Sequence, residues 1–235
     1  MSTTQWRGNN KITDVFFDLD HTLWDFEKNS ALTFGHLLEK HRMGIPLGDF
    51  LEVYVPVNRK CWEEYREGRI DQIELRRRRL RETFFTLGAS VEHNFIDQLS
   101  EDYIRYLTKY NHLFDHTTEI LSYLKPGYRL HIITNGFDKV QDKKLFNSGI
   151  HTYFTHVVNS ETAGVKKPHP AIFEHALQRA GIKAENSVMI GDDFVADIQG
   201  AMKVGMHAIH YNTRKERGGE EVITIHDLLE IKKYL

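Results

Sequence analysis

Two carboxylates one residue apart follow an apolar run near the N-terminus. The stretch ITDVFFDLDHTLWDF places Asp18 and Asp20 directly after strand-forming residues. On a continuing strand, side chains two residues apart share a face, and at the junction with a loop both would point at the same place. Two acids so close either repel one another or have a cation between them. The stretch therefore raises the possibility of a cation site.

Polar residues also follow three later apolar runs. These residues are Thr134 and Asn135 after LHII, Ser160 and Glu161 after HVVN, and Asp192 and Asp193 after VMIG. Just beyond the third of the four strands, Lys167 precedes a proline that restricts the turn. In a parallel α/β sheet, ligands bind outside the carboxyl ends of the strands. We therefore expect acids, a hydroxyl, an amide and an ammonium to meet at one edge of a sheet.

Phosphoryl transfer is the chemistry that such a set suits. Carboxylates without a cysteine or histidine cluster suit Mg²⁺, and Asp18 and Asp192 are the expected pair of ligands. Lys167 and Thr134 can hold phosphate oxygens, the first as a point charge and the second as a donor. Asp18 can then attack phosphorus to form an aspartyl-phosphate. Asp20 can protonate the leaving alkoxide and then activate water.

The elements that position these residues alternate along the chain. From about residue 112 onward, strand-like runs alternate with amphipathic helical stretches, which is typical of a parallel sheet wrapped by helices. The run before Asp18 belongs to the same sheet. We therefore predict an α/β fold with a doubly wound parallel sheet, formed by residues 1–23 and 112–235. Residues 24–111 instead indicate successive helices, an inserted helical cap in which Pro56 should end or kink one helix.

Composition narrows the class of partner. The 235 residues include 31 Lys+Arg and 33 Asp+Glu, for a formal net charge of −2, which gives no electrostatic reason to bind a nucleic acid polymer. The single cysteine, Cys61, excludes an internal disulfide framework and fits a reducing compartment. The N-terminus has no apolar core of signal-peptide length, and no later run suggests a membrane span. We expect a cytoplasmic protein, a monomer or small homo-oligomer, that acts on a small phosphorylated metabolite.

Four motifs together resemble the haloacid dehalogenase-like superfamily. They are DLDHT at 18–22, TN at 134–135, Lys167 in KKPHPAIF, and GDDFVAD at 191–197. The resemblance implies a Rossmann-like core, with the helical insertion in the place of the family's C1-type cap. Within the superfamily, DLDHTLWDF and the long helical segment are most similar to the pyrimidine 5′-nucleotidase group. That narrower resemblance implies nucleoside 5′-monophosphates as substrates.

The resemblance also implies roles for the acids. Asp18 would be the nucleophile and a Mg²⁺ ligand, and Asp20 the acid/base that also lends its backbone carbonyl to the metal. Asp192 would be a further metal ligand. Asp193 or Asp197 would support it, the latter as a helix residue acting through water.

The same resemblance implies a phosphate site made of Thr134, Asn135 and Lys167. Lys167 is chosen over its neighbour Lys166 because the family's lysine directly precedes proline.

Each feature alone has an ordinary explanation. Aspartate after a strand is commonly a turn residue or a helix cap. A calcium loop counted from Asp18 would have Leu23 in place of its glycine and Asn29 in place of its glutamate, so that alternative is poor. The arginines at 76–79 lie beside an apolar stripe at helical spacing, which favours a solvated helix face over a basic patch. Trp24 and Phe26 are candidates for the core, the hinge or the substrate pocket.

Several functions remain open at this point. The leading hypothesis is a Mg²⁺-dependent phosphatase, with a sugar-phosphate or phosphoglycolate phosphatase and a phosphomutase as close alternatives. A metal-independent haloacid dehalogenase attacks carbon, and Asp20 and Asp192 argue against it. A non-catalytic regulatory protein would be suggested by a missing nucleophile or lysine, and both Asp18 and Lys167 are present.

Overall fold

The structure is a computed structural model, and it describes residues 11–213 and 222–235. The chain divides into two compact units. One comprises the described residues up to Phe26 together with those from Asn111 onward, and the other comprises Glu27–Tyr110. Residues 1–10, on which part of the localisation prediction depends, lie outside the described residues. Among the residues described, none of the helices combines the length and apolar character that crossing a membrane requires.

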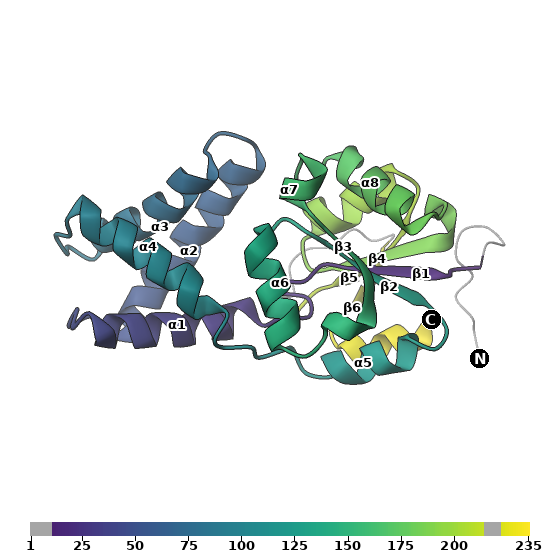
Figure 1. Cartoon of the computed structure of the whole chain (residues 1–235), viewed down its shortest axis with the longest axis horizontal. Coiled ribbons are helices and arrows are strands. Elements are labelled where there is room, and N and C mark those ends of the chain that lie inside the picture. The colour runs from purple at the N-terminus through teal and green to yellow at the C-terminus, as the bar shows by residue number, and fades with distance from the viewer. Residues whose placement is uncertain (1–10, 214–221) are drawn as a thin grey trace. The chain divides into compact units, whose positions relative to one another are not determined.

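The first unit is built on a six-stranded parallel sheet in the order β3-β2-β1-β4-β5-β6 (Figure 1). The strands are β1 (Asp14–Phe17), β2 (Arg129–Thr134), β3 (Phe154–Asn159), β4 (Ser187–Gly191), β5 (His207–Tyr211) and β6 (Ile223–Ile225). From β1 the chain adds β2 and then β3 on one side, and it then crosses to the other side of β1 to add β4, β5 and β6. The strand order therefore reverses beside β1, and ligands bind at such a switch point. The predicted doubly wound α/β fold is confirmed. The short strand β6 was not predicted.

The register of the central strands aligns the residues that follow them. Phe17, the last residue of β1, is in register with Ile132 of β2 and Ile190 of β4. The backbone N–H of Asp18 then donates to the carbonyl of Ile190 at 2.9 Å. The polar residues that follow these three strands therefore emerge at the same edge of the sheet.

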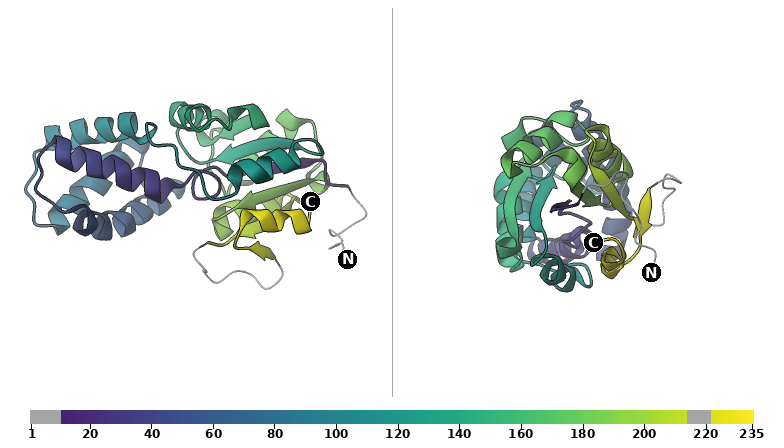
Figure 2. Two further views of the ribbon diagram at one scale, coloured as in Figure 1. Left: turned by 90° about the horizontal axis from the view of Figure 1, so that it is seen from below. Right: turned by 90° about the vertical axis from the view of Figure 1, so that its right-hand side faces the viewer.

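Helices cover both faces of this sheet. Figures 1 and 2 show α8 over one face and α5, with the C-terminal segment beside it, over the other. The α-helices of this unit are α5 (Thr117–Leu124), α6 (Asp138–Asn147), α7 (Ser160–Ala163), α8 (Pro170–Ala180) and α9 (Gly200–Lys203). The tighter 3₁₀ turns are η1 (His151–Tyr153), η2 (Ala184–Asn186) and η4 (Leu228–Lys233), and η3 (Phe194–Gln199) is a π-helical turn. The C-terminal helical segment is therefore 3₁₀ in type.

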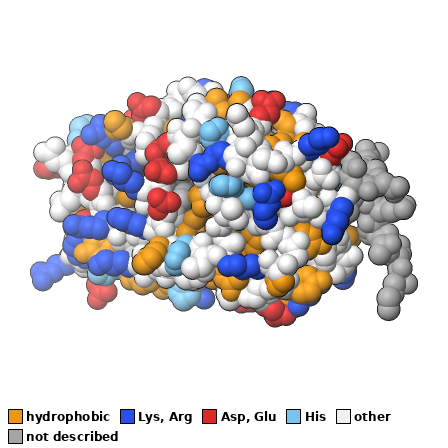
Figure 3. All heavy atoms as spheres, turned by 45° about the vertical axis from the view of Figure 1, so that its right-hand side comes forward, with side chains coloured by type: hydrophobic (Ala, Val, Ile, Leu, Met, Phe, Trp, Pro, Cys, Tyr) orange, Lys and Arg blue, Asp and Glu red, His pale blue; other side chains and the backbone are white. Residues whose placement is uncertain are grey.

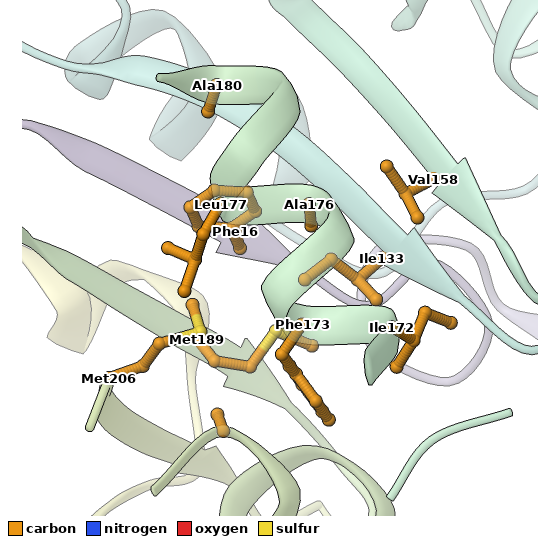
Figure 4. Packing of buried hydrophobic residues seen from close by; sticks show 11 residues of the cluster. Phe16, Ile133, Val158, Ile172, Phe173, Ala176, Leu177, Ala180, Met189 and Met206 are labelled. Carbon is orange, nitrogen blue, oxygen red and sulfur yellow. The ribbon is translucent and has the colours of Figure 1, made fainter. Parts of the chain in front are cut away.

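The apolar face of α8 packs against the sheet. Its buried side chains recur at helical spacing, at positions 172, 173, 176, 177 and 180. Figure 4 shows them gathered with Phe16, Ile133 and Met189, which come from three strands. Proline at the first position and a left-handed Gly181 just past the end define the limits of α8. This packing holds the loop that carries Lys167 at the end of the sheet.

Four long helices make up most of the second unit. They are α1 (Phe26–Lys40), α2 (Leu47–Arg66), α3 (Gln72–Thr86) and α4 (His93–Leu107). Their core is aromatic: Phe34 lies with its ring centroid 4.4 to 4.6 Å from those of Phe50, Tyr54 and Tyr103. Pro56 lies inside α2 and does not end it.

The arginine run of α3 is only partly a solvated face. Arg77 and Arg81 are about half-exposed and pair with acids, as expected. Arg79, in contrast, is 2% exposed, donates to Asn58 at 3.1 Å and stacks its guanidinium over Tyr103. The prediction is wrong for Arg79 because the helical period turns that position toward the aromatic core.

On the face drawn in Figure 3, basic and acidic side chains are interspersed, in keeping with the small net charge.

Candidate active site

Lys167 and Asp18 form the centre of the site. The Lys167 ammonium lies 2.5 Å from Oδ1 of Asp18 and 2.7 Å from Oδ1 of Asp197, and it donates to the Ile133 carbonyl at 2.8 Å. All three side chains are almost completely buried. Asp18 directly follows β1, the carbonyl belongs to β2, and the loop before α8 supplies the lysine. Residues 149 positions apart in the chain are thereby brought into direct contact.

Three carboxylates converge beside this lysine. Asp18, Asp192 and Asp197 each place an oxygen so that all three oxygens lie within 4.8 Å of one another. The single charge of Lys167 cannot neutralise three carboxylates, so when all three are ionised two negative charges remain in excess in a largely buried place. A divalent cation that prefers oxygen ligands fits both the charge and the donor set. Asp197 thus belongs to the cluster directly, whereas the side chain of Asp20 lies outside it.

The turn after β4 positions Asp197. Asp193 begins the π-helical turn by accepting the N–H groups of Val195 and Ala196 with Oδ1. Its own N–H donates to Oδ2 of Asp197 at 3.1 Å. A Cβ at Gly191 would lie 2.2 Å from that same Oδ2. Glycine at 191 therefore leaves the room that the Asp197 carboxylate occupies.

Asp20 has partners of its own. Lys144 approaches its Oδ1 at 2.5 Å, and the Gln141 side-chain amide donates to its Oδ2 at 2.9 Å. The ammonium of Lys144 also lies 4.4 Å from the ring centroid of Trp24 and 5.4 Å from that of Phe26. Trp24 is fully buried, so it is not available to stack on a substrate. Phe26 is half-buried.

Thr134, the last residue of β2, and Asn135, which follows it, act differently. The Thr134 hydroxyl oxygen accepts from Gln141 at 2.8 Å and from the N–H of Gly136 at 3.2 Å, which leaves its proton to donate to a ligand. Asn135 instead bonds the backbone of Lys167 twice, accepting its N–H at 2.7 Å and donating to its carbonyl at 3.0 Å. These bonds give the Asn135 side chain a positioning role for the lysine, and its predicted contact with phosphate stays a prediction.

Burial dominates the electrostatics of the site. It raises the pKa of Asp18 to about 7, with Lys167 opposing the shift and the charge of Asp197 adding to it. Burial also raises the pKa of Asp197, again against the effect of Lys167. For Lys167, burial disfavours the ammonium, but the charges of Asp18 and Asp197 outweigh it and hold the pKa above its ordinary value. A bound cation would favour the ionised form of both acids.

Two residues of the site were missed in the sequence. Gln141 and Lys144 lie three apart on α6, so they share a face of the helix. Both are almost fully buried, which is unusual for these residue types. The run VQDKKLF offers no means of distinguishing Lys144 from its neighbour Lys143, because only the packing of α6 shows which of the two is buried.

The comparison with protein families identifies the class of protein. The family of haloacid dehalogenase-like hydrolases matches residues 14–205. The chain belongs to this family, and it is a hydrolase.

Among individual proteins, the chain is 32% identical to the pyrimidine 5′-nucleotidase PynA of Streptococcus pneumoniae, over 84% of this chain and 83% of that one. It is equally identical, 32%, to a glyceraldehyde 3-phosphate phosphatase of Pyrococcus abyssi, over 87% of this chain and 83% of that one. Among solved structures, the magnesium-bound HAD-hydrolase YfnB of Bacillus subtilis is 28% identical and covers 94% of this chain and 97% of its own, with a TM-score of 0.85. The predicted resemblance is confirmed.

Proposed function

We propose that this protein is a Mg²⁺-dependent phosphatase that hydrolyses small phosphomonoesters through an aspartyl-phosphate on Asp18. The first unit is its catalytic core, and the helical unit is its cap domain. The observation that carries the proposal is the buried cluster in which Asp18 contacts Lys167 and lies beside Asp192 and Asp197. Phosphoryl transfer to aspartate requires a carboxylate nucleophile and positive charge around the phosphate, which an ammonium and acids that can hold a divalent cation supply.

The reaction has two steps. In the first, an oxygen of Asp18 bonds to phosphorus and the bond from phosphorus to the leaving oxygen breaks, while Asp20 gives a proton to that oxygen. In the second, Asp20 takes a proton from water, the water oxygen bonds to phosphorus, and the bond to Asp18 breaks. Phosphate and alcohol are released, and both carboxyl groups are restored. Lys167 and Thr134 hold phosphate oxygens in both steps.

Magnesium would be held by Asp18, Asp192 and Asp197, with Asp20 contributing its backbone carbonyl. When bound, it supplies positive charge that offsets the negative charge of the phosphate and its transition state. The donor set fits this ion, since the three carboxylates are hard oxygen ligands and exceed the charge of Lys167.

As substrates we propose nucleoside 5′-monophosphates, with pyrimidine nucleotides preferred. Support comes from the similarity to a pyrimidine 5′-nucleotidase and from the aromatic Phe26 just after the nucleophile loop, which is partly exposed. A base bound at a distance from phosphorus supplies binding energy that can be converted into turnover.

A kinetic screen tests the proposal. In the presence of Mg²⁺, kcat/KM for dUMP, dTMP or UMP should exceed the values for glucose 6-phosphate, phosphoglycolate and glyceraldehyde 3-phosphate by at least about tenfold, which is about 1.4 kcal/mol of transition-state binding. Asp18→Asn is the control, because it preserves the size of the side chain and removes the nucleophile, so turnover should be lost with every substrate. Near wild-type turnover in Asp18→Asn would contradict the mechanism.

A second candidate differs only in the substrate. The relative from Pyrococcus abyssi is named for glyceraldehyde 3-phosphate, and it is as similar to this chain as PynA is. If a sugar phosphate, phosphoglycolate or glyceraldehyde 3-phosphate outranks every nucleotide in the screen, the substrate is of that class and the nucleotide assignment is wrong, while the phosphatase mechanism stands.

A further inference from the structure

Gln141 connects two residues with different proposed roles. Its side-chain nitrogen donates to the hydroxyl oxygen of Thr134 at 2.8 Å and to Oδ2 of Asp20 at 2.9 Å. An amide nitrogen has two hydrogens, so both bonds form at once. The phosphate-binding hydroxyl and the acid/base carboxylate are therefore held at a set separation by one side chain.

Lys144 holds the other oxygen of the same carboxylate. Its ammonium lies 2.5 Å from Oδ1 of Asp20, and its side chain is only 3% exposed. The faces of Trp24 and Phe26 lie against this cation. The lysine consequently has little freedom to move, and neither does the carboxylate that it binds.

The backbone makes room for this arrangement at Gly136. A Cβ there would lie 2.3 Å from Cδ of Gln141 and 2.5 Å from its Nε2. Any residue other than glycine would push the Gln141 amide away from both of its acceptors. The position of the amide thus depends on the chain at the end of β2 as well as on α6.

Stability alone does not account for the pair of Lys144 and Asp20. Burying the Lys144 ammonium carries a desolvation cost that often equals the gain from pairing it, so an apolar residue of similar volume would stabilise the fold as well. A fixed geometry is what such a pair supplies that apolar residues do not. Here the group that the pair holds in a fixed geometry is the carboxylate of Asp20, the proposed acid/base.

We propose that Gln141 and Lys144 are positioning residues that hold the Asp20 carboxylate in place for proton transfer to the leaving group. The inference rests on the proposed function of Asp20 as the acid/base. A carboxylate has about four lone-pair positions on its two oxygens, so these two donors leave room for the transferred proton. Losing either donor lets the carboxylate rotate away from the leaving oxygen, which weakens general acid catalysis without removing the nucleophile or the metal ligands.

A matched pair of substrates separates this role from a merely structural one. Phenyl phosphate and p-nitrophenyl phosphate have similar shapes, but phenolate is the more basic leaving group and depends more on a proton. The first step is reported by kcat/KM, because it includes the steps up to release of the phenol. In Lys144→Met and Gln141→Leu, we expect kcat/KM for phenyl phosphate to fall by about tenfold or more, with a clearly smaller loss for p-nitrophenyl phosphate.

Controls use the same helix. Lys143→Met makes the same chemical change at an exposed position one residue away and should leave kcat/KM for both substrates unchanged. Lys144→Arg keeps a cation and should recover part of the loss with phenyl phosphate. Circular dichroism and thermal melting establish that each variant is folded.

The outcomes distinguish the inference from the function on which it rests. Asp20→Asn is measured alongside and should show the largest difference between the two substrates. Suppose that Asp20→Asn shows this difference, but kcat/KM in Lys144→Met and Gln141→Leu falls equally with both substrates or does not fall. The positioning role is then overturned, and the function of Asp20 stands. Equal losses in Asp20→Asn itself would overturn both.

Discussion

Substituting alanine for Gly191 tests whether the position of one carboxylate controls the metal site. The added Cβ would lie 2.2 Å from Oδ2 of Asp197, 2.5 Å from its Cγ and 2.6 Å from its Cβ. Ordinary contact begins at 3.4 Å, so the oxygen must retreat by about 1.2 Å. It cannot do so and keep both the N–H of Asp193 at 3.1 Å and its place in the acid cluster.

The expected magnitude follows from this displacement. Forcing extra volume into a packed site costs about 1–3 kcal/mol of stability, which a chain of this size should tolerate. Loss of support for a metal ligand typically weakens metal binding by about 10- to 100-fold. We therefore expect Gly191→Ala to remain folded, to bind Mg²⁺ about 10- to 100-fold more weakly, and to lose kcat/KM at limiting metal.

The assay is calorimetric titration with Mg²⁺, together with urea unfolding to measure stability. Gly48→Ala is the matched control, since a Cβ there meets nothing within 4 Å and α2 continues through that position. It should leave metal binding unchanged and stabilise the fold by up to about 1 kcal/mol. Wild-type Mg²⁺ affinity in Gly191→Ala would refute the reasoning that Asp197 must stay where Gly191 allows it.

Two further predictions concern stability. Phe173→Ala removes a fully buried ring from the contact between α8 and the sheet and should lower the free energy of unfolding in urea by about 3–5 kcal/mol. The control Phe146→Ala, at a residue 67% exposed, should change it by less than about 0.5 kcal/mol. Similar values for both variants would contradict the packing described for Phe173. Burial alone would raise the pKa of Asp14, but bonds from His131 and Arg129 outweigh it, so its folded pKa lies below the ordinary 3.8. The stability from Asp14 is therefore complete above that value and is lost as pH falls through the folded pKa. Asp14→Asn should lower the free energy of unfolding by about 1–3 kcal/mol at pH 7, and below about pH 4 this free energy should fall less steeply than in the wild type. If the pH dependence of stability is the same in both, Asp14 does not contribute.

The strands that carry the site could be predicted because each one is a short apolar run followed by polar residues. In a parallel sheet buried on both faces, strands need continuous apolar side chains, and VFF, LHII and VMIG supply them. The polar residues at their ends then mark the edge where ligands bind. Asp18, Thr134 and Asp192 could be found in this way without any knowledge of contacts.

Residues whose roles depend on packing between distant elements could not be predicted. Gln141 and Lys144 look like ordinary residues of an amphipathic helix, and Arg79 looks like one member of a solvated run. Their burial depends on which face of each helix meets its neighbours, and a helix with polar residues on several faces does not specify that face by composition alone. The π-helical turn that carries Asp197 was likewise expected to be an ordinary helix.

The sequence by itself therefore determined the α/β class, the inserted helical segment and the chemical types available for catalysis, because these depend on local periodicity and on residues at strand ends. Only the tertiary structure decided which of them touch. It placed Asp197 against Lys167, turned the Asn135 amide to the backbone of Lys167, and buried Lys144 against Asp20. The physical reason is that such contacts join segments far apart in the chain, and their geometry arises from the packing of α6 and α8 beside the sheet and from the space left by glycines at strand ends.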